Sequence, residues 1–325
     1  MEDKLLRKII HSITHLRRDY KNGGAPHKPI LVLSIIALYE KDLVKDCKIF
    51  LTPELVSIFK KIWNDLVITK HICNITLPFY HLKTADFWEL IPNFGYEAII
   101  KSKIQLKSFR NLNDAVNYAL LDSTLCFYLK NRNTRELIKQ QVISTYFPHA
   151  KNTKTPFLKP LRILNELENE ILKEPSEIYQ QKIKEIQNTA TIETYEEEIF
   201  IRSAVFKRMI AKIYNDSCAI TGLKIDSIFT ASMIDACHIK PFSQSYDDTI
   251  SNGIALSPTL HRAFDRGIIS IDQDYKVMVS NKIKETSNHK FSIQELEGEK
   301  IYLPQNSQHF PNQKNLEWHR KNIFK

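Results

Sequence analysis

Glycine and long apolar runs are both scarce in this sequence. Only 7 of the 325 residues are glycine, which excludes collagen-like repeats and flexible low-complexity chains. The longest apolar stretch, residues 29–39, contains a serine and is too short to span a bilayer. The first eight residues, MEDKLLRK, lack the apolar core of a secretion signal. Since 43% of the residues are hydrophobic and 26% are charged, we expect a soluble, folded, cytoplasmic protein of two or three domains without membrane association.

Cysteine is rare, and its spacing shows no pairing. The sequence has five cysteines, none of them in a C-x-x-C pair: Cys47, Cys73, Cys126, Cys218 and Cys237. An odd number without a secretion signal argues against a disulfide framework, and the lack of paired spacing argues against a four-ligand structural zinc site. We expect most of the five to be small buried hydrophobic side chains, and we expect no structural zinc.

Acidic residues are outnumbered by basic ones, 37 against 46, and the net charge is +9. Most of the excess lies in residues 1–150, whereas residues 151–200 are acidic. A basic N-terminal half indicates a polyanionic partner such as nucleic acid, although a net charge of this size also serves solubility.

The hydrophobic pattern predicts an α+β fold. Apolar residues have helical spacing over 5–16, after Pro29, after the helix start Thr52-Pro53, and over 113–129. Residues 79–90 have a pattern typical of mixed strand and turn. The chain then divides into a mixed α/β N-terminal domain, residues 1–150; a helical connector, residues 151–200; and a C-terminal domain, residues 201–325.

The chemistry of the C-terminal domain is concentrated between residues 218 and 279. The pattern predicts a short strand carrying His238, a loop, and a second strand that begins at Asn252. A helix then starts at Ser257-Pro258 and presents His261 in its first turn, beside free backbone N–H groups. A single histidine is more often structural than catalytic, but this ordered set is able to hydrolyse a phosphodiester around one hard cation.

These residues resemble a known family, the ββα-metal HNH endonucleases, over about residues 202–282. The spacing His238–Asn252–His261 and the segments CAITG, DACHIKP, NG and LHRAFDRG are similar to those of McrA-type restriction endonucleases. The resemblance implies a C-terminal HNH domain that uses one divalent cation per site, Mg²⁺ or Mn²⁺.

The same resemblance implies a role for each matched residue. His238 would be the general base, Asn252 would orient it through its backbone, and His261 would be a metal ligand. Asp235 occupies the acidic ligand position, but it lies three residues before His238 rather than directly before it, and strand alternation places the two on opposite faces. Asp265, one helical turn after His261, is the alternative ligand. Nearby basic residues are candidates to hold phosphates or are ordinary surface charges: Lys240, Arg262 and Arg266.

The N-terminal half carries a second resemblance. The segments APHKP, residues 25–29, and LPFYHL, residues 77–82, resemble the sulfur-binding domain of phosphorothioate-dependent restriction endonucleases. By that match an apolar cup would receive the sulfur atom while basic groups hold the phosphate. The residues implied are His27, Lys28, Pro78, Phe79, Tyr80 and His81. The alternative is that APHKP is only a turn and helix start, and that the aromatic residues belong to the core.

Together these patterns predict a modification-dependent, type IV-like restriction endonuclease that acts on double-stranded DNA, with phosphorothioate as the expected modification. Since one ββα site cuts one strand, cleavage of a duplex implies a homodimer. The alternatives are an HNH nuclease guided by another modification, a homing or toxin-like nuclease with nonspecific DNA binding, and a catalytically silent DNA-binding protein.

Overall fold

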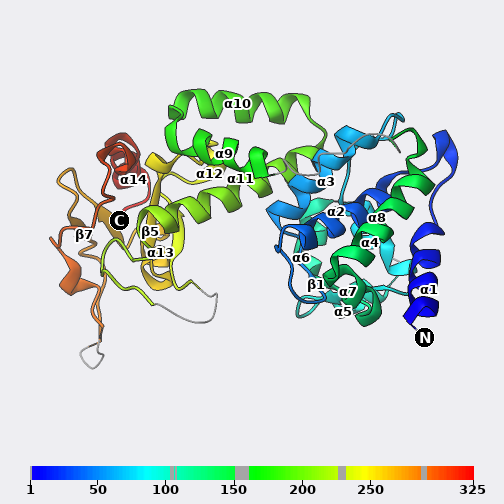
Figure 1. Ribbon diagram of the computed structural model, residues 1–325. Helices are drawn as coiled ribbons and strands as arrows, with labels where there is room; N and C mark the ends of the chain where they lie inside the picture. Colours follow the sequence, from blue (N-terminus) through cyan, green and yellow to red (C-terminus); the bar gives the residue numbers. More distant parts are fainter. Residues whose placement is uncertain (1, 103–105, 107, 151–160, 226–231, 287–290) are drawn as a thin grey trace. The chain divides into compact units, whose positions relative to one another are not determined.

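The computed structural model describes the chain except residues 1, 103–105, 107, 151–160, 226–231 and 287–290, and it divides into two compact units (Figure 1). Unit 1 comprises Met1–Leu164 and Ala190–Ile201, and unit 2 comprises Asn165–Thr189 and Arg202–Lys325. Helices and three small antiparallel sheets confirm the expected α+β class. No helix in the described part of the chain is both long and apolar enough to cross a membrane.

Unit 1 is built around helix α2 (His27–Glu40), in which every residue from Lys28 to Tyr39 is buried. Its apolar residues are distributed around the whole circumference, so the helix can only be stable when neighbours cover all its sides. Those neighbours include α3 (Pro53–Leu66), α4 (Thr76–His81), α7 (Ser123–Lys130) and α8 (Arg132–Tyr146). The predicted start of α3 is confirmed, because the Thr52 side chain accepts a hydrogen bond from the Leu55 amide.

The single helix expected over 113–129 is wrong. The segment contains the end of α6 (Phe109–Ala115), then strand β3 (Val116–Leu121), then α7. Strand β3 is the centre of a three-stranded sheet, between β1 (Lys48–Ile49) and β2 (Trp88–Pro92). Pairing on both edges outweighs the local helical pattern.

The mixed strand and turn expected over 79–90 is also wrong at its start. Residues 79–81 belong to α4, and a 3-10 turn (Leu82–Thr84) separates that helix from β2. The Asn74 side chain accepts a hydrogen bond from the Leu77 amide at the start of the helix, and Pro78 lies in the first turn, where a missing N–H costs nothing.

A disulfide joins Cys47 to Cys126, which lie 79 positions apart. The sequence argument against a disulfide framework gave no reason to expect this pair. Only the fold brings the residue before β1 next to helix α7. Cys218 and Cys237 are buried and unpaired, as the sequence indicated for most cysteines, and Cys73 is partly exposed.

Unit 2 contains a ββα element. Strand β4 (Asp235–His238) pairs antiparallel with β5 (Gly253–Leu256), and α13 (Pro258–Asp265) follows. The second half of α11 (Ile192–Ile213) packs against β5 at Gly253, where an added Cβ would lie 2.3 Å from Ile210 Cδ1. The absence of a side chain at Gly253 therefore permits this close approach.

The remaining elements of unit 2 surround that ββα element. Helices α9 (Leu161–Lys173) and α10 (Ser176–Thr189) are separated at Pro175. A hairpin of β6 (Ile269–Ile271) and β7 (Val277–Val279) and the C-terminal helix α14 (Gln313–Asn322) complete the unit.

Candidate functional site

His238 is the last residue of β4, and its ring is held on two sides. Its Nε2 atom lies 2.8 Å from Oδ1 of Asp248, a residue of the loop between the two strands. The Phe206 ring stacks on the imidazole, with centroids 4.1 Å apart and planes 10° apart. Since an ionised carboxylate can only accept a hydrogen bond, Nε2 is the protonated nitrogen and Nδ1 keeps its lone pair.

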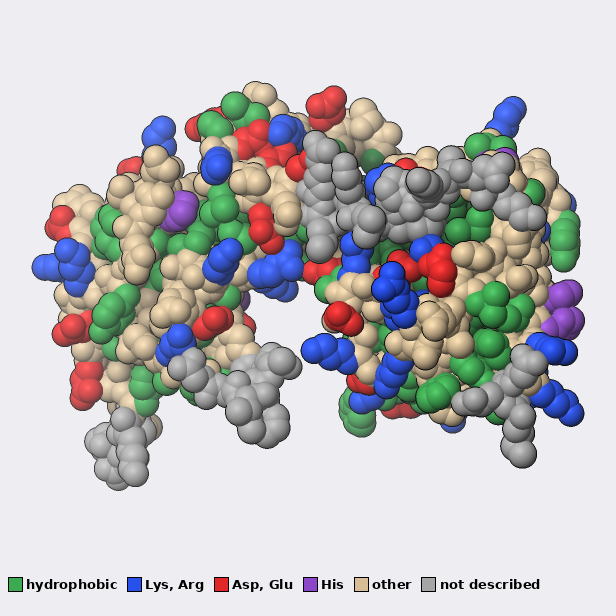
Figure 2. Space-filling model, in the orientation of Figure 1, with side chains coloured by type: hydrophobic (Ala, Val, Ile, Leu, Met, Phe, Trp, Pro, Cys, Tyr) green, Lys and Arg blue, Asp and Glu red, His purple; other side chains and the backbone are tan. Residues whose placement is uncertain are grey.

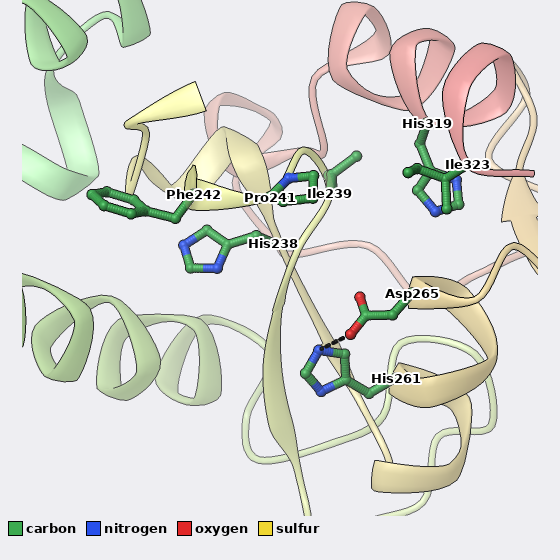
Figure 3. A pocket seen from close by; sticks show the side chains of 8 residues that line it. All are labelled: His238, Ile239, Pro241, Phe242, His261, Asp265, His319 and Ile323. Carbon is green, nitrogen blue, oxygen red and sulfur yellow. Dashed lines mark ion pairs between the residues drawn. The ribbon is translucent and has the colours of Figure 1, made fainter. Parts of the chain in front are cut away.

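His261 lies in the first turn of α13, between two carboxylates. Its Nδ1 atom is 3.2 Å from Oδ2 of Asp235, and its Nε2 atom is 3.3 Å from Oδ2 of Asp265 (Figure 3). Asp235 reaches the helix because it is the first residue of β4 and so lies at the end of the strand. Strand alternation predicted that Asp235 and His238 lie on opposite faces of the strand. Because Asp235 lies at the strand end, its carboxylate still reaches His261.

The two carboxylates differ in their other contacts. Oδ1 of Asp265 is 3.8 Å from the thiol of Cys237, and burial together with Asp265 raises the pKa of Cys237, so the thiol donates to the carboxylate. The side chains of Asp235 and Asp265 are similarly exposed, 47% and 55%, but the Asp235 carboxylate has no hydrogen-bond partner other than His261 among the described residues. Asp235 is therefore the carboxylate with an oxygen still available to a ligand.

Asn252 is fully buried and ties the loop to the strand. Its Oδ1 accepts a hydrogen bond from the Lys240 amide at 2.9 Å, and its Nδ2 donates to the Lys240 and Asp247 carbonyls, each at 2.9 Å. The resemblance implied a hydrogen bond to the backbone of the base. The observed bonds are to Lys240, two residues after His238, and to Asp247, the residue before Asp248. Asn252 therefore holds the main chain beside both His238 and Asp248.

His238, His261 and Asp265 border a hollow of about 300 Å³ that Phe242 also lines, whereas Asp235 and Asp248 contact these histidines from outside its lining (Figure 3). His319 also lines it, but both of its ring nitrogens are occupied, by Ser270 and by the Phe264 carbonyl. Burial lowers the pKa of His319 to about 4, so the ring is neutral at physiological pH and serves packing. The hollow thus exposes one oriented imidazole and one imidazole between carboxylates.

The basic residues singled out near this site lie outside the hollow. The Lys240 ammonium lies 5.2 Å from the centroid of the Trp318 ring. Arg262 and Arg266 are exposed, and neither forms an ion pair with any described residue. Figure 2 shows lysine and arginine side chains interspersed with acidic ones on the visible face rather than gathered in one patch.

Unit 1 has a pocket of about 630 Å³ that brings together four of the residues implied by the second resemblance, namely His27, Lys28, Pro78 and His81. Phe79 and Tyr80 do not reach it. Both are buried, Phe79 edge-on against Trp88 and Tyr80 beneath the Lys83 ammonium. The physical reason is that this segment is helical: Pro78 and His81, three residues apart, share the face that borders the pocket, whereas Phe79 and Tyr80 point into the core.

Lys28 is the unusual group of this pocket, which we call the Lys28 pocket. Its side chain donates to the Arg17 carbonyl at 2.8 Å and to the Thr84 hydroxyl at 3.0 Å, and the residue is 9% exposed. Both acceptors are neutral, and no carboxylate forms an ion pair with Lys28 among the described residues. Burial, with a smaller contribution from Arg17, lowers the pKa of Lys28. A buried ammonium without a counter-ion favours an anionic ligand.

His27 and His81 line the Lys28 pocket without adding full charge. Nε2 of His27 lies 2.9 Å from the Ile72 carbonyl and so carries the proton, and burial lowers the pKa of His27. Burial and the nearby Lys28 lower the pKa of His81. Both imidazoles therefore tend to be neutral at physiological pH.

Several residues of these sites escaped the sequence reasoning. Asp248 and Phe206 contact His238, and Arg17 and Arg18 line the Lys28 pocket. The Asp-Asp pair at 247–248 and the Arg-Arg pair at 17–18 were visible as charge pairs, but nothing in their spacing connected them with a site.

Comparison with known proteins identifies a family for part of the chain. Residues 218–272 match the model of a family described as HNH endonuclease, which supports a DNA nuclease. A solved structure titled "Modification dependent TagI restriction endonuclease" is similar at 19% sequence identity and a TM-score of 0.30, over 38% of this chain and 39% of that one. No curated protein matches the chain.

Proposed function

We propose that this protein is a modification-dependent, type IV-like restriction endonuclease that hydrolyses phosphodiester bonds of double-stranded DNA. One observation carries the nuclease part: His238, oriented by Asp248, and His261, placed between Asp235 and Asp265, open into the same hollow of a ββα element. The family match at 218–272 supports the same reaction.

The donor set of the ββα element fits a divalent cation such as Mg²⁺ or Mn²⁺. Carboxylate oxygen is the donor that these cations prefer, and Nδ1 of His261 faces the Asp235 carboxylate, so the two side chains together offer one nitrogen and one oxygen donor. His261 and Asp235 would hold the cation, while Asp265 would fix the His261 ring through its other nitrogen, as carboxylates commonly do for metal-bound histidines. When bound, the cation polarises a phosphoryl oxygen and stabilises the leaving oxygen.

His238 supplies the general base. Its Nδ1 accepts the proton of the attacking water, and the Phe206 ring and Asp248 keep the imidazole in one orientation during the transfer. Asn252 holds the main chain on which both His238 and Asp248 depend. Arg262 and Arg266, exposed and without acidic partners in the described chain, are available to hold neighbouring phosphates.

The Lys28 pocket is the proposed reading site. The Lys28 ammonium, with its unmatched positive charge, would contact the modified phosphate, and the ring of Pro78 would give the larger, poorly hydrated sulfur atom an apolar surface. Phosphorothioate is the modification that this combination of buried charge and apolar wall fits best.

A second candidate modification is favoured by one observation. The Lys28 pocket, at about 630 Å³, is larger than a sulfur atom requires and lies in the size range of pockets that enclose a small ligand. A modified nucleobase turned out of the duplex is therefore the alternative ligand. In either case one site per chain cuts one strand, so we propose a homodimer for cleavage of both strands.

The test uses three plasmids of identical sequence: unmodified, phosphorothioate-modified and base-methylated, each incubated with the protein and Mn²⁺. Cleavage of only the phosphorothioate plasmid is the expected result. Cleavage of only the methylated plasmid would select the second candidate, and equal cleavage of all three would indicate a nonspecific nuclease. Binding without cleavage of any plasmid would indicate a catalytically silent DNA-binding protein. Sedimentation of the protein with and without DNA measures the oligomeric state.

A further inference from the structure

We propose that Asp248 is the positioning residue of the general base: it selects the tautomer of His238 that has its lone pair on Nδ1. This inference rests on the proposed nuclease function, and it adds a residue to the site that neither resemblance nor the family match assigns. Under this proposal helix α10, which lies in the connector predicted over residues 151–200, helps to stabilise the catalytic site.

The geometry of the pair favours a single protonation state of the ring. The Asp248 side chain is 1% exposed, and its Oδ1 lies 2.8 Å from Nε2 of His238. A carboxylate in this place accepts the Nε2–H bond, so the other nitrogen, Nδ1, is the basic atom. When Nδ1 takes a proton from water, the ring becomes an imidazolium, and the unchanged Asp248 carboxylate stabilises its charge.

Asp248 is itself fixed by groups from two directions. The Tyr179 hydroxyl, on α10, donates to Oδ2 at 3.3 Å. The preceding residue is anchored on the other side, because the Asp247 carbonyl accepts from Asn252 and the Asp247 carboxylate accepts from the Thr249 amide. A buried carboxylate with both oxygens engaged has little freedom to turn away from His238.

The first test compares Asp248→Asn with Asp274→Asn, which makes the same chemical change at an exposed position. With its amide oxygen accepting from the Tyr179 hydroxyl, the side chain of Asp248→Asn would turn its NH₂ toward Nε2, move the ring proton to Nδ1 and so remove the basic lone pair. We expect kcat for Mn²⁺-supported plasmid cleavage to fall by about 10²- to 10⁴-fold in Asp248→Asn, with DNA affinity unchanged. Tyr179→Phe should lower kcat less, and Asp274→Asn should not change it. A kcat within threefold of wild type for Asp248→Asn would overturn the proposal.

The second test is made on the wild-type protein and needs no activity. In ¹⁵N-histidine-labelled protein at a pH where the ring is neutral, the His238 resonances should show a protonated Nε2 and an unprotonated Nδ1. Comparison with His238→Ala assigns the signals. A proton on Nδ1 would overturn the role of Asp248. Cleavage that persists in His238→Ala would instead overturn the proposed base, and this tautomer measurement would remain valid on its own.

Discussion

Phe206 and His238 lie face to face, with ring centroids 4.1 Å apart and planes 10° apart. Phe206 is on α11, and His238 is the last residue of β4. The two rings can stack because Gly253 has no side chain that would separate the helix from the sheet. The stack limits rotation of the imidazole, so the orientation of the proposed base depends on how α11 packs as well as on Asp248.

His238→Ala should abolish cleavage while DNA affinity stays within about twofold of wild type. The reason is that the variant removes the proton acceptor and leaves the Lys28 pocket of unit 1 intact. Plasmid nicking and filter binding on the same preparation measure the two quantities. Cleavage near the wild-type rate would contradict the assignment of the base.

Gly253→Ala should destabilise the protein by about 1–3 kcal/mol, because its Cβ would lie 2.3 Å from Ile210 Cδ1 and 2.8 Å from the Phe206 ring. Chemical denaturation measures the change in the free energy of unfolding. Adding Ile210→Val, which deletes the atom in closest contact, should recover part of the loss. A double variant as unstable as the sum of the two single variants would exclude this steric explanation.

Asp235→Asn should raise the Mn²⁺ concentration needed for half-maximal cleavage more than Asp265→Asn does. Asp235 has an available oxygen, whereas the oxygens of Asp265 already contact His261 and Cys237. Loss of a direct ligand is expected to cost more than loss of an orienting group. Calorimetric Mn²⁺ titration of both variants provides a measurement without DNA, and the reverse order would assign the metal to Asp265.

Binding to the Lys28 pocket should separate into a charge contribution and an apolar contribution. With His238→Ala as the uncleaving background, Lys28→Met should weaken binding to modified and unmodified duplexes alike and reduce the salt dependence of both by about one unit of slope. Pro78→Ala should reduce only the preference for the phosphorothioate duplex. Phe94→Ala, which removes a fully exposed aromatic outside this pocket, is the control. Equal affinity for both duplexes at every salt concentration would reject sulfur reading.

Acid should destabilise unit 2 through His319. In the folded protein burial lowers the pKa of His319 to about 4, whereas the unfolded chain titrates near 6.5. Between these values the unfolded chain binds a proton that the folded chain does not, so stability falls as the pH drops from 6.5 to 4, by about 3 kcal/mol in total. Hydrogen exchange in α14 measures this loss. The loss of stability between pH 6.5 and 4 should be smaller in His319→Gln. It should be unchanged in His15→Gln, the control variant at an exposed histidine.

Local signals in the sequence determined several elements directly. Thr52 caps its helix, Pro258 begins the helix that carries His261, and His238 lies on a short strand as the pattern indicated. Such features depend on neighbouring residues and on backbone chemistry, which are visible along the chain. The ordered spacing of His238, Asn252 and His261 belongs to the same class of information.

Tertiary structure alone decided the contacts between distant residues. It joined Cys47 to Cys126, turned Phe79 and Tyr80 into the core, and divided the expected helix at 113–129 with a strand that has partners on both edges. It also placed Phe206 and Asp248 against His238, and buried the Lys28 ammonium without a counter-ion. The sequence determined which groups were available for chemistry, whereas packing determined which of them meet, because pairing and burial depend on neighbours that local pattern does not contain.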